Sequence, residues 1–287
     1  MKLPDILSFP DVKLRIRDAL AEDLGPKKLD ATSFALVPPG ETAEAHLVAR
    51  HECILAGGPV ATEVFRQMDA SLEITQKKKD GAKLKPGDVV LTISGSARSI
   101  LVAERTALNF VQRMTGIATM TRRYVEEADN PEVLILDTRK TTPTLRTFEK
   151  YSVVCGGGTN HRYGLFDRVL IKDNHLAHWA REGGDLAGSI RATRTKYPDL
   201  LVEVEVDTIH QLKAILPAKP DWVLLDNMSL DELRECVKLC SGICKTEASG
   251  GVTLKTIREI AQTGVNAISV GALTHSAPSC DLALDFV

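Results

Sequence analysis

The chain has 287 residues, 44% of them hydrophobic and 26% charged, which is the composition of an ordinary globular protein. Lys and Arg number 36 against 38 Asp and Glu, and this net charge of −2 argues against a general nucleic-acid or membrane-surface binder. No stretch approaches the roughly 18 consecutive apolar residues of a membrane span. The segment 1–11 carries acids and prolines where a signal peptide would be apolar, so we expect a cytoplasmic protein.

The first part of the chain, to about residue 115, mixes helix and strand patterns. Apolar residues recur at helical spacing in some segments and alternate with polar residues in others. The expected helices are 12–22, 60–68 and 99–127, and the expected strands are 42–50 and 89–94. Gly25-Pro26 ends the first helix, and Gly116 is expected to interrupt the last one.

From Pro131 onward, short apolar runs alternate with helical segments. The runs are 133–136, 169–171, 201–206, 222–225, 245–248 and 267–270, and the helices between them are 186–196, 209–216, 230–239 and 254–263. This alternation indicates a parallel sheet covered by helices. The span is shorter than the ~250 residues of a full eightfold barrel, so we expect an incomplete parallel βα-barrel. An open doubly wound sheet is the alternative, but it would place its ligand at one switch point.

Cationic side chains gather in three loop segments, 137–143, 156–162 and 171–175. At least two of these segments follow an apolar run directly. Because the carboxyl ends of parallel strands share one edge, we expect one pocket to collect these cations: Arg139, Lys140, His161, Arg162 and Lys172. Such a cluster is costly unless an anionic ligand neutralises it, so the sequence predicts a site for a small polyanion.

Carboxylates and glycine turns are expected at the same edge. Glu203 and Glu205 share one face of a strand, and Glu205 and Asp226 belong to neighbouring strands. These acids suit Mg²⁺ or sugar hydroxyls, although Glu205 could instead form a structural salt bridge with Lys172. Lys172 could also be a Schiff-base nucleophile, but the flanking arginines favour charge pairing. The turns at Ser249-Gly250-Gly251 and around Gly271 suit phosphate, or simply begin helices.

Taken together, these motifs closely resemble the quinolinate phosphoribosyltransferase family nearly end to end. The matching segments are 19–25, 95–96 with 104–110, 137–143, 160–162, 171–175, 203–205, 225–227, 249–251 and 271–276. Departures are small. Thr144 stands where the family usually has glycine, which is expected to stiffen the loop slightly, and 26–29 replaces a shorter acidic turn.

The resemblance implies an N-terminal α/β sandwich domain over 1–115, joined by the C-terminal segment 276–287, and a TIM-like incomplete barrel over 116–275. It also implies a homodimer in which the partner subunit completes each active site. The implied reaction transfers phosphoribosyl from phosphoribosyl pyrophosphate to quinolinate with decarboxylation, in NAD synthesis. The alternatives are a related phosphoribosyltransferase of the molybdenum-transport-associated type, a Schiff-base lyase, and a non-catalytic anion-binding module.

The resemblance also assigns roles to individual residues. The residues implied to bind the two carboxylates of quinolinate are Arg105 from the partner subunit, Arg139, His161, Arg162 and Lys172. Those implied to hold phosphoribosyl pyrophosphate and its Mg²⁺ are Lys140, Glu205 and Asp226, with Ser249, Gly250, Gly251, Val270, Gly271 and Ala272 on phosphate. Thr138 is expected to contact substrate, and the residues expected to act in catalysis are Lys140, Lys172, Glu205 and Asp226.

Overall fold

The computed structural model describes residues 3–181 and 183–287 of the chain, which divides into two compact units. The first unit consists of the residues up to Arg122 together with Lys140–Gly157 and Ala272–Val287. The second consists of Arg123–Arg139 and Gly158–Gly271. The boundary expected at residue 115 falls inside one long helix, α4 (Ala97–Ala128). Among the described helices, none combines the length and the apolar character that crossing a bilayer requires.

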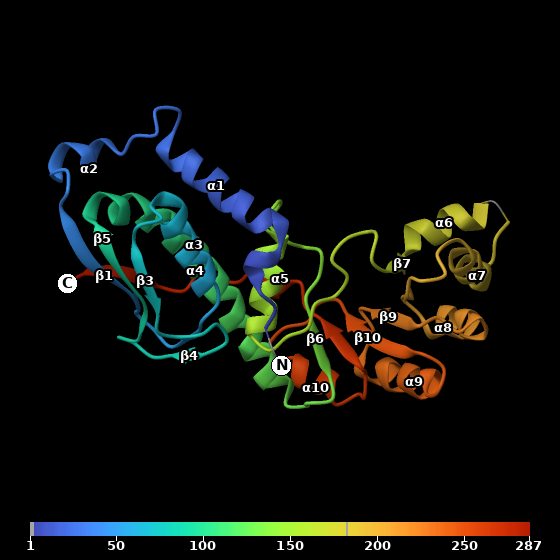
Figure 1. Cartoon of the computed structure of the whole chain (residues 1–287). Helices are drawn as coiled ribbons and strands as arrows, with labels where there is room; N and C mark the ends of the chain where they lie inside the picture. The colour runs from blue at the N-terminus through green and yellow to red at the C-terminus, as the bar shows by residue number, and fades with distance from the viewer. Residues whose placement is uncertain (1–2, 182) are drawn as a thin grey trace. The chain divides into compact units, whose positions relative to one another are not determined.

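The first unit is built on an antiparallel sheet with the strand order β12-β1-β5-β3 (Figure 1). Its strands are β1 (Thr42–Ala49), β3 (Glu73–Gln76), β5 (Val89–Ser96) and β12 (Leu282–Phe286), and a small separate sheet joins β2 (Cys53–Ile54) to β4 (Lys83–Leu84). Its helices are η1 (Ile6–Ser8), α1 (Pro10–Leu24), α2 (Ala31–Leu36), α3 (Gly58–Met68), most of α4, α5 (Arg146–Cys155) and α11 (Ala272–His275). The C-terminal segment thus supplies an edge strand of this sheet.

Most of the elements expected in this part of the chain are confirmed. Helices α1 and α3 bury the apolar faces that their periodicity predicts, including Ile16 and Val64 at 0% exposure. Gly25 ends α1 with a positive φ of 63°, a conformation that glycine adopts without a steric penalty. Strands β1 and β5 pair with each other and bury Leu47 and Leu91 in the same core.

The expected interruption of α4 near Gly116 is wrong, because the helix runs unbroken from Ala97 to Ala128. Gly116 serves a different purpose. A Cβ built on it would lie 2.0 Å from the backbone oxygen of Pro278. The C-terminal segment therefore passes so close to α4 that only glycine fits at this position, and the residue marks a close backbone approach rather than a break.

The second unit contains a six-stranded parallel sheet with the order β6-β11-β10-β9-β8-β7. The strands are β6 (Leu134–Leu136), β7 (Val169–Ile171), β8 (Val202–Val206), β9 (Trp222–Asp226), β10 (Lys245–Ser249) and β11 (Ala267–Ser269). The helices are α6 (Asp173–Arg181), α7 (Leu186–Lys196), α8 (Ile209–Ile215), with the short η2 (Leu216–Ala218), α9 (Leu230–Cys240) and α10 (Ile257–Ala261). Thr208 and Ser229 begin α8 and α9 with capping boxes completed by Gln211 and Glu232.

The strand order decides between the two expected architectures. It follows chain order around a cycle that is open between β6 and β7, and within the described residues these two strands do not pair. A doubly wound sheet would instead reverse its order at a switch point. The chain is therefore an α/β protein whose second unit is an incomplete, TIM-like parallel βα-barrel and whose first unit is an α/β sandwich.

Substituting Gly116 by alanine tests the close approach to Pro278. In an open helix this change stabilises by about 1 kcal/mol, but here the added methyl group overlaps a backbone oxygen, and we expect a net loss of about 2 kcal/mol. The melting temperature of Gly116→Ala should fall accordingly. Gly40→Ala is the control, because a Cβ at Gly40 meets no atom within 4 Å and adds only the cost of a left-handed alanine. A melting temperature at or above that of the unsubstituted chain would contradict the packing.

Candidate active site

The carboxyl ends of the parallel strands in the second unit carry the polar residues that the sequence singled out. Lys172 directly follows β7, Glu205 is the penultimate residue of β8, and Asp226 and Ser249 end β9 and β10. Ser249 and Asp226 are direct neighbours in the register of these two strands. Because all six strands are parallel, these side chains share the edge at which barrel enzymes place their active sites.

Lys172 and Glu205 form a close ion pair at this edge. The Lys172 Nζ lies 2.6 Å from Glu205 Oε2, with the lysine side chain 45% exposed and the glutamate 13% exposed. The salt bridge considered for these residues is therefore present. It fits the charge-pairing role of Lys172 better than that of a free amine attacking a carbonyl.

The turn after β10 depends on glycine. Gly250 and Gly251 have φ values of 92° and 60°, and a Cβ on Gly250 would lie 2.1 Å from Asn227 Oδ1. The backbone N–H of Asn227 donates to the carbonyl of Ser249 at 2.9 Å, which ties the turns after β9 and β10 together. Val270 follows β11 in the same way, its N–H donating to Leu136 O at 2.9 Å. These glycine turns leave the backbone open to a close ligand.

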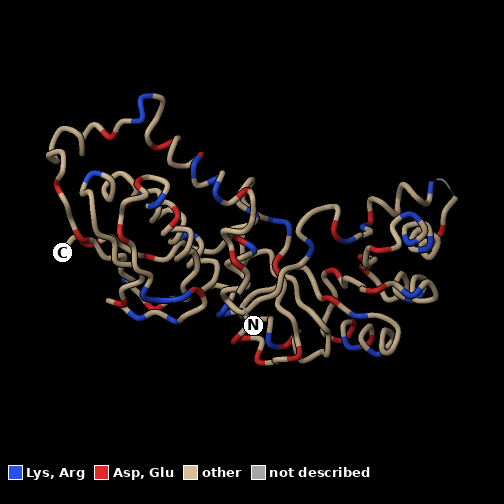
Figure 2. The backbone as a smooth tube through the Cα atoms, viewed as in Figure 1, with Lys and Arg blue, Asp and Glu red and all other residues tan. Residues whose placement is uncertain are grey.

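Two arginines belong to loops near the carboxyl end of β6. Arg139 lies exposed after β6, next to the half-buried Thr138, and Arg162 is half-buried. Burial and the positive charge of Arg139 lower the pKa of Arg162 below its ordinary value, which places the two guanidinium groups in each other's field. Figure 2 shows that acidic and basic residues are otherwise interspersed along the chain. The local positive field expected at this edge stays a prediction, because the carboxylates of Glu205 and Asp226 lie at the same edge as these cations.

His161 occupies a different environment from the arginines. Its side chain is 7% exposed, and Nε2 lies 3.2 Å from Glu203 Oε2 and 3.3 Å from Glu247 Oε2, both carboxylates being 0% exposed. Direct contact of His161 with a substrate stays a prediction, since the contacts in the structure are with the protein's own acids. Sequence reasoning missed Glu247 as a functional residue. Its signal was an acid in the middle of a buried strand, which requires a partner.

The first unit carries the other predicted residues. Arg105 is exposed on α4, Lys140 is exposed in the loop before α5, and Ala272 begins α11. The carbonyl of Lys140 accepts a hydrogen bond from Thr274 Oγ1 at 2.7 Å, which fixes the start of that loop.

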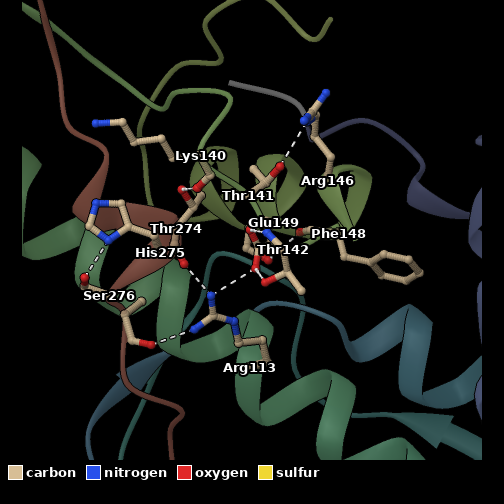
Figure 3. Close-up of polar contacts among 12 residues, drawn as sticks. Arg113, Lys140, Thr141, Thr142, Arg146, Phe148, Glu149, Thr274, His275 and Ser276 are labelled. Atoms are coloured by element: carbon tan, nitrogen blue, oxygen red, sulfur yellow. Dashed lines mark hydrogen bonds and ion pairs between the residues drawn. The ribbon is translucent and has the colours of Figure 1, made fainter. Parts of the chain in front are cut away.

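A buried ion pair between α4 and α5 holds the loop of Lys140 (Figure 3). Arg113 Nη2 lies 2.9 Å from Glu149 Oε1, and Glu149 also accepts from the N–H and the hydroxyl of Thr142, at 3.1 and 2.8 Å. Arg113 donates further to the carbonyls of Thr274 and Ala277. The pair was not expected from the sequence, because its members are distant along the chain and lie on separate helices.

Thr144, in the same loop, adopts a φ of 67°. This left-handed conformation costs a β-branched residue about 1 kcal/mol, whereas glycine adopts it freely. The threonine that was expected to stiffen this loop therefore stands at a position whose backbone suits glycine.

An incomplete parallel barrel with cations, carboxylates and glycine turns on one edge has the arrangement of an active site in a barrel enzyme. Family models agree with this class. The N-terminal domain model of quinolinate phosphoribosyl transferase matches residues 30–115, and the C-terminal domain model matches residues 117–285. The chain belongs to the quinolinate phosphoribosyltransferase family, whose members are pentosyltransferases.

Individual relatives are similar over nearly their whole length. A probable nicotinate-nucleotide pyrophosphorylase (carboxylating) from Bacillus subtilis is 42% identical over 265 residues, covering 92% of this chain and 89% of the relative. A nicotinate-nucleotide pyrophosphorylase (carboxylating) from Mycobacterium leprae is 41% identical, covering 96% and 98%. The solved structure of the nicotinate-nucleotide pyrophosphorylase from Francisella tularensis superposes with a TM-score of 0.91 at 36% identity, with both chains covered completely.

Replacing Glu149 by glutamine tests the ion pair that holds the loop of Lys140. The change keeps the shape but leaves Arg113 without its counter-charge, and we expect a loss of about 2–3 kcal/mol, reduced from the fully buried case because Arg113 is 29% exposed. Urea unfolding of Glu149→Gln measures this loss, and Glu126→Gln, an exposed acid on α4, is the matched control. Equal midpoints for the two variants would show that the pair contributes little.

Proposed function

We propose that this chain transfers the phosphoribosyl group of phosphoribosyl pyrophosphate to quinolinate and releases pyrophosphate and CO₂, giving nicotinate mononucleotide for NAD synthesis. Membership of the family supports the reaction. The observation that carries the site is the gathering of Arg139, Arg162 and Lys172 beside two carboxylates and two glycine turns on one barrel edge. Both substrates are polyanions, which accounts for a cationic edge in a protein of net charge −2.

The two carboxylates of quinolinate suit the arginines. A guanidinium binds a carboxylate through two parallel N–H donors, and the positive charge of Arg139 acts on Arg162, so we assign both to one small dianion. Lys172 adds a third positive charge, oriented by Glu205. In this proposal Thr138 contacts the same substrate from the end of β6.

Phosphoribosyl pyrophosphate would occupy the adjoining part of the edge. Glu205 and Asp226 lie near the carboxyl ends of neighbouring strands, and carboxylate oxygens are the ligands that Mg²⁺ prefers, so these residues fit a Mg²⁺ ion that arrives with the pyrophosphate. The backbone of Ser249–Gly251 suits a phosphate group, because Gly250 adopts a positive φ and lets the chain approach closely. Val270, Gly271 and Ala272 would bind phosphate in the same manner, with Lys140 on the pyrophosphate.

The chemistry requires positioning and charge rather than a covalent enzyme intermediate. The ring nitrogen of quinolinate forms a bond to C1 of the ribose while the bond from C1 to the pyrophosphate oxygen breaks. Positive charge develops on the sugar, and the carboxylates of Glu205 and Asp226 stabilise it. The ring nitrogen is then cationic, and its charge stabilises the electron pair that stays on C2 when the 2-carboxylate departs as CO₂; C2 then uses this pair to take a proton.

Arg105 is proposed to serve a neighbouring chain in a homodimer. It is exposed on α4, the helix whose apolar face includes Ala103 and Leu108 in the core of the first unit. This packing fixes the helix while Arg105 points to solvent. In a two-fold dimer, an exposed residue of this kind can contact the active site of the second copy, and the symmetry gives both sites the same contact. The proposed compartment is the cytoplasm.

The choice of acceptor can be tested directly with the purified chain, phosphoribosyl pyrophosphate and Mg²⁺. Nicotinic acid lacks one carboxylate and would leave a cation of the site unpaired, so its kcat/KM should be lower than that of quinolinate by roughly 10² or more. Release of CO₂ and formation of nicotinate mononucleotide measure the reaction with quinolinate. Comparable turnover of nicotinic acid would contradict the two-carboxylate site, and absence of turnover with quinolinate would contradict the proposed function.

Subunit exchange tests the role of Arg105. Arg105→Ala and Lys172→Ala should each abolish most activity, but a mixed dimer would contain one intact site, built from Arg105 of one chain and Lys172 of the other. With random exchange of equal amounts, about half of the dimers are mixed, and activity should reappear to roughly a quarter of that of the unsubstituted enzyme, which has two sites per dimer. Mixing Arg105→Ala with Arg105→Ala/Lys172→Ala is the control. No recovery after verified exchange would place Arg105 in its own site or in none.

A further inference from the structure

The loop 158–168, between α5 and β7, contains neither helix nor regular strand, yet it carries His161 and Arg162. One isolated bridge joins it to the sheet, between Thr159 and Leu136 at the edge strand β6. The N–H of His161 donates to the carboxylate of Asp137 at 2.9 Å, and Asp137 is 0% exposed. The backbone at His161 is therefore fixed to the end of β6.

The ring of His161 connects the sheet to the backbone of Arg162. On one side Nε2 faces the buried carboxylates of Glu203, from β8, and Glu247, from β10. On the other side Nδ1 accepts a hydrogen bond from the N–H of Arg162 at 2.7 Å. Both ring nitrogens are thus used within the protein.

The contacts form a closed circuit. The Arg162 Nη1 donates to the carbonyl of Arg168 at 3.2 Å, and the Arg168 Nη1 in turn donates to Glu203 Oε2 at 3.2 Å. The Arg168 guanidinium also lies over the ring of Trp222, 5.1 Å from its centroid. Starting from Glu203, the circuit passes through His161, Arg162 and Arg168 and returns to Glu203. Arg162 is therefore held both at its backbone N–H and at its guanidinium.

The proton count of the cluster follows from this geometry. Because Nδ1 accepts a hydrogen bond, the ring proton lies on Nε2, and one N–H satisfies one of the two carboxylates at a time. Burial raises the pKa of Glu247, so this acid retains a proton more readily than an exposed one. Burial lowers the pKa of His161 and the contacts with Glu203 and Glu247 raise it, to about 9. A second ring proton would have to lie on Nδ1 and oppose the N–H of Arg162, so this hydrogen bond favours the neutral ring.

We propose that His161, Glu203 and Glu247 are positioning residues that orient Arg162 for a carboxylate of the substrate. The proposal rests on the proposed function only in giving Arg162 a carboxylate to bind. It assigns the histidine a role inside the protein. It also makes Glu247, which is fully buried in β10, necessary for tight binding of the acceptor.

The same three side chains also have the composition of a metal site, with His161, Glu203 and Glu247 offering ligand atoms within 4.8 Å of one another. One feature favours protons over a metal ion. Arg168 already pairs with Glu203, and a divalent cation beside that guanidinium would be repelled.

A double-mutant cycle on the full chain tests the positioning role. Calorimetry should show that Glu247→Gln weakens quinolinate binding by about tenfold when Arg162 is present, but by less than about twofold in the Arg162→Ala background. The KM for phosphoribosyl pyrophosphate should stay unchanged, and Glu259→Gln, an exposed acid on α10, is the matched control. Equal losses in both backgrounds would overturn the proposal, because a general structural defect does not depend on Arg162.

Two measurements separate this proposal from the proposed function. Nitrogen NMR of labelled histidine in the ligand-free chain should show that Nδ1 of His161 carries no proton, and this result does not depend on which substrate the enzyme uses. A proton on Nδ1 would overturn the circuit. Elemental analysis should give the same metal content for the purified chain and for Glu247→Gln. One metal ion per chain that is present in the unsubstituted chain and lost in Glu247→Gln would overturn the protonated cluster. If quinolinate is not turned over while Nδ1 is bare, the proposed function fails and the circuit stands.

Discussion

The two carboxylates buried inside the parallel sheet, Glu203 and Glu247, impose the constraint on which the site depends. Removing a charged carboxylate from water costs several kcal/mol unless hydrogen bonds and counter-charges replace the solvent. The loop 158–168 supplies those partners through His161 and Arg168. A segment without regular secondary structure thereby acquires a defined course, and Arg162 is fixed as a consequence.

The first unit applies the same principle around Lys140. There Glu149, 1% exposed in its side chain, accepts hydrogen bonds from Arg113 and from Thr142, two residues after Lys140. In both loops a buried acid that faces no substrate fixes the segment that carries a cationic residue. A cation held in place loses less conformational entropy on binding an anion than a mobile one does, and this favours tight binding of a small dianion.

The sequence predicted the barrel strands well, because a parallel strand buried on both faces is short and mostly apolar, as in β6, β7 and β11. All six runs became strands within one or two residues of the predicted ends. Helix α5 was missed for the opposite reason. It buries polar and charged residues such as Lys150 and Ser152 along with Phe148, so it has no clean apolar stripe. The helix break predicted at Gly116 was wrong, since sequence alone cannot distinguish a glycine that ends a helix from one that admits a neighbouring backbone.

The candidate site divides along a similar line. Residues at strand ends, such as Lys172 and Asp226, could be predicted because topology alone brings them to one edge. The partners of the buried acids could not, because an acid inside an apolar strand signals that a partner exists without saying which residue it is.

His161 and Arg162 show what adjacency adds to such a prediction. Read as a pair of cations, they suggest two ligands for one anion. In the structure the ring of His161 accepts a hydrogen bond from the N–H of Arg162 while its other side faces the buried acids. His161 therefore holds Arg162 in place, and Arg162 is the residue proposed to bind the anion. Only a side chain with a hydrogen-bond acceptor near its own backbone and a donor at its far end can make both contacts, and a neutral imidazole offers this combination in a rigid ring. The physical requirement at position 161 is thus for a donor and an acceptor on opposite sides, rather than for positive charge.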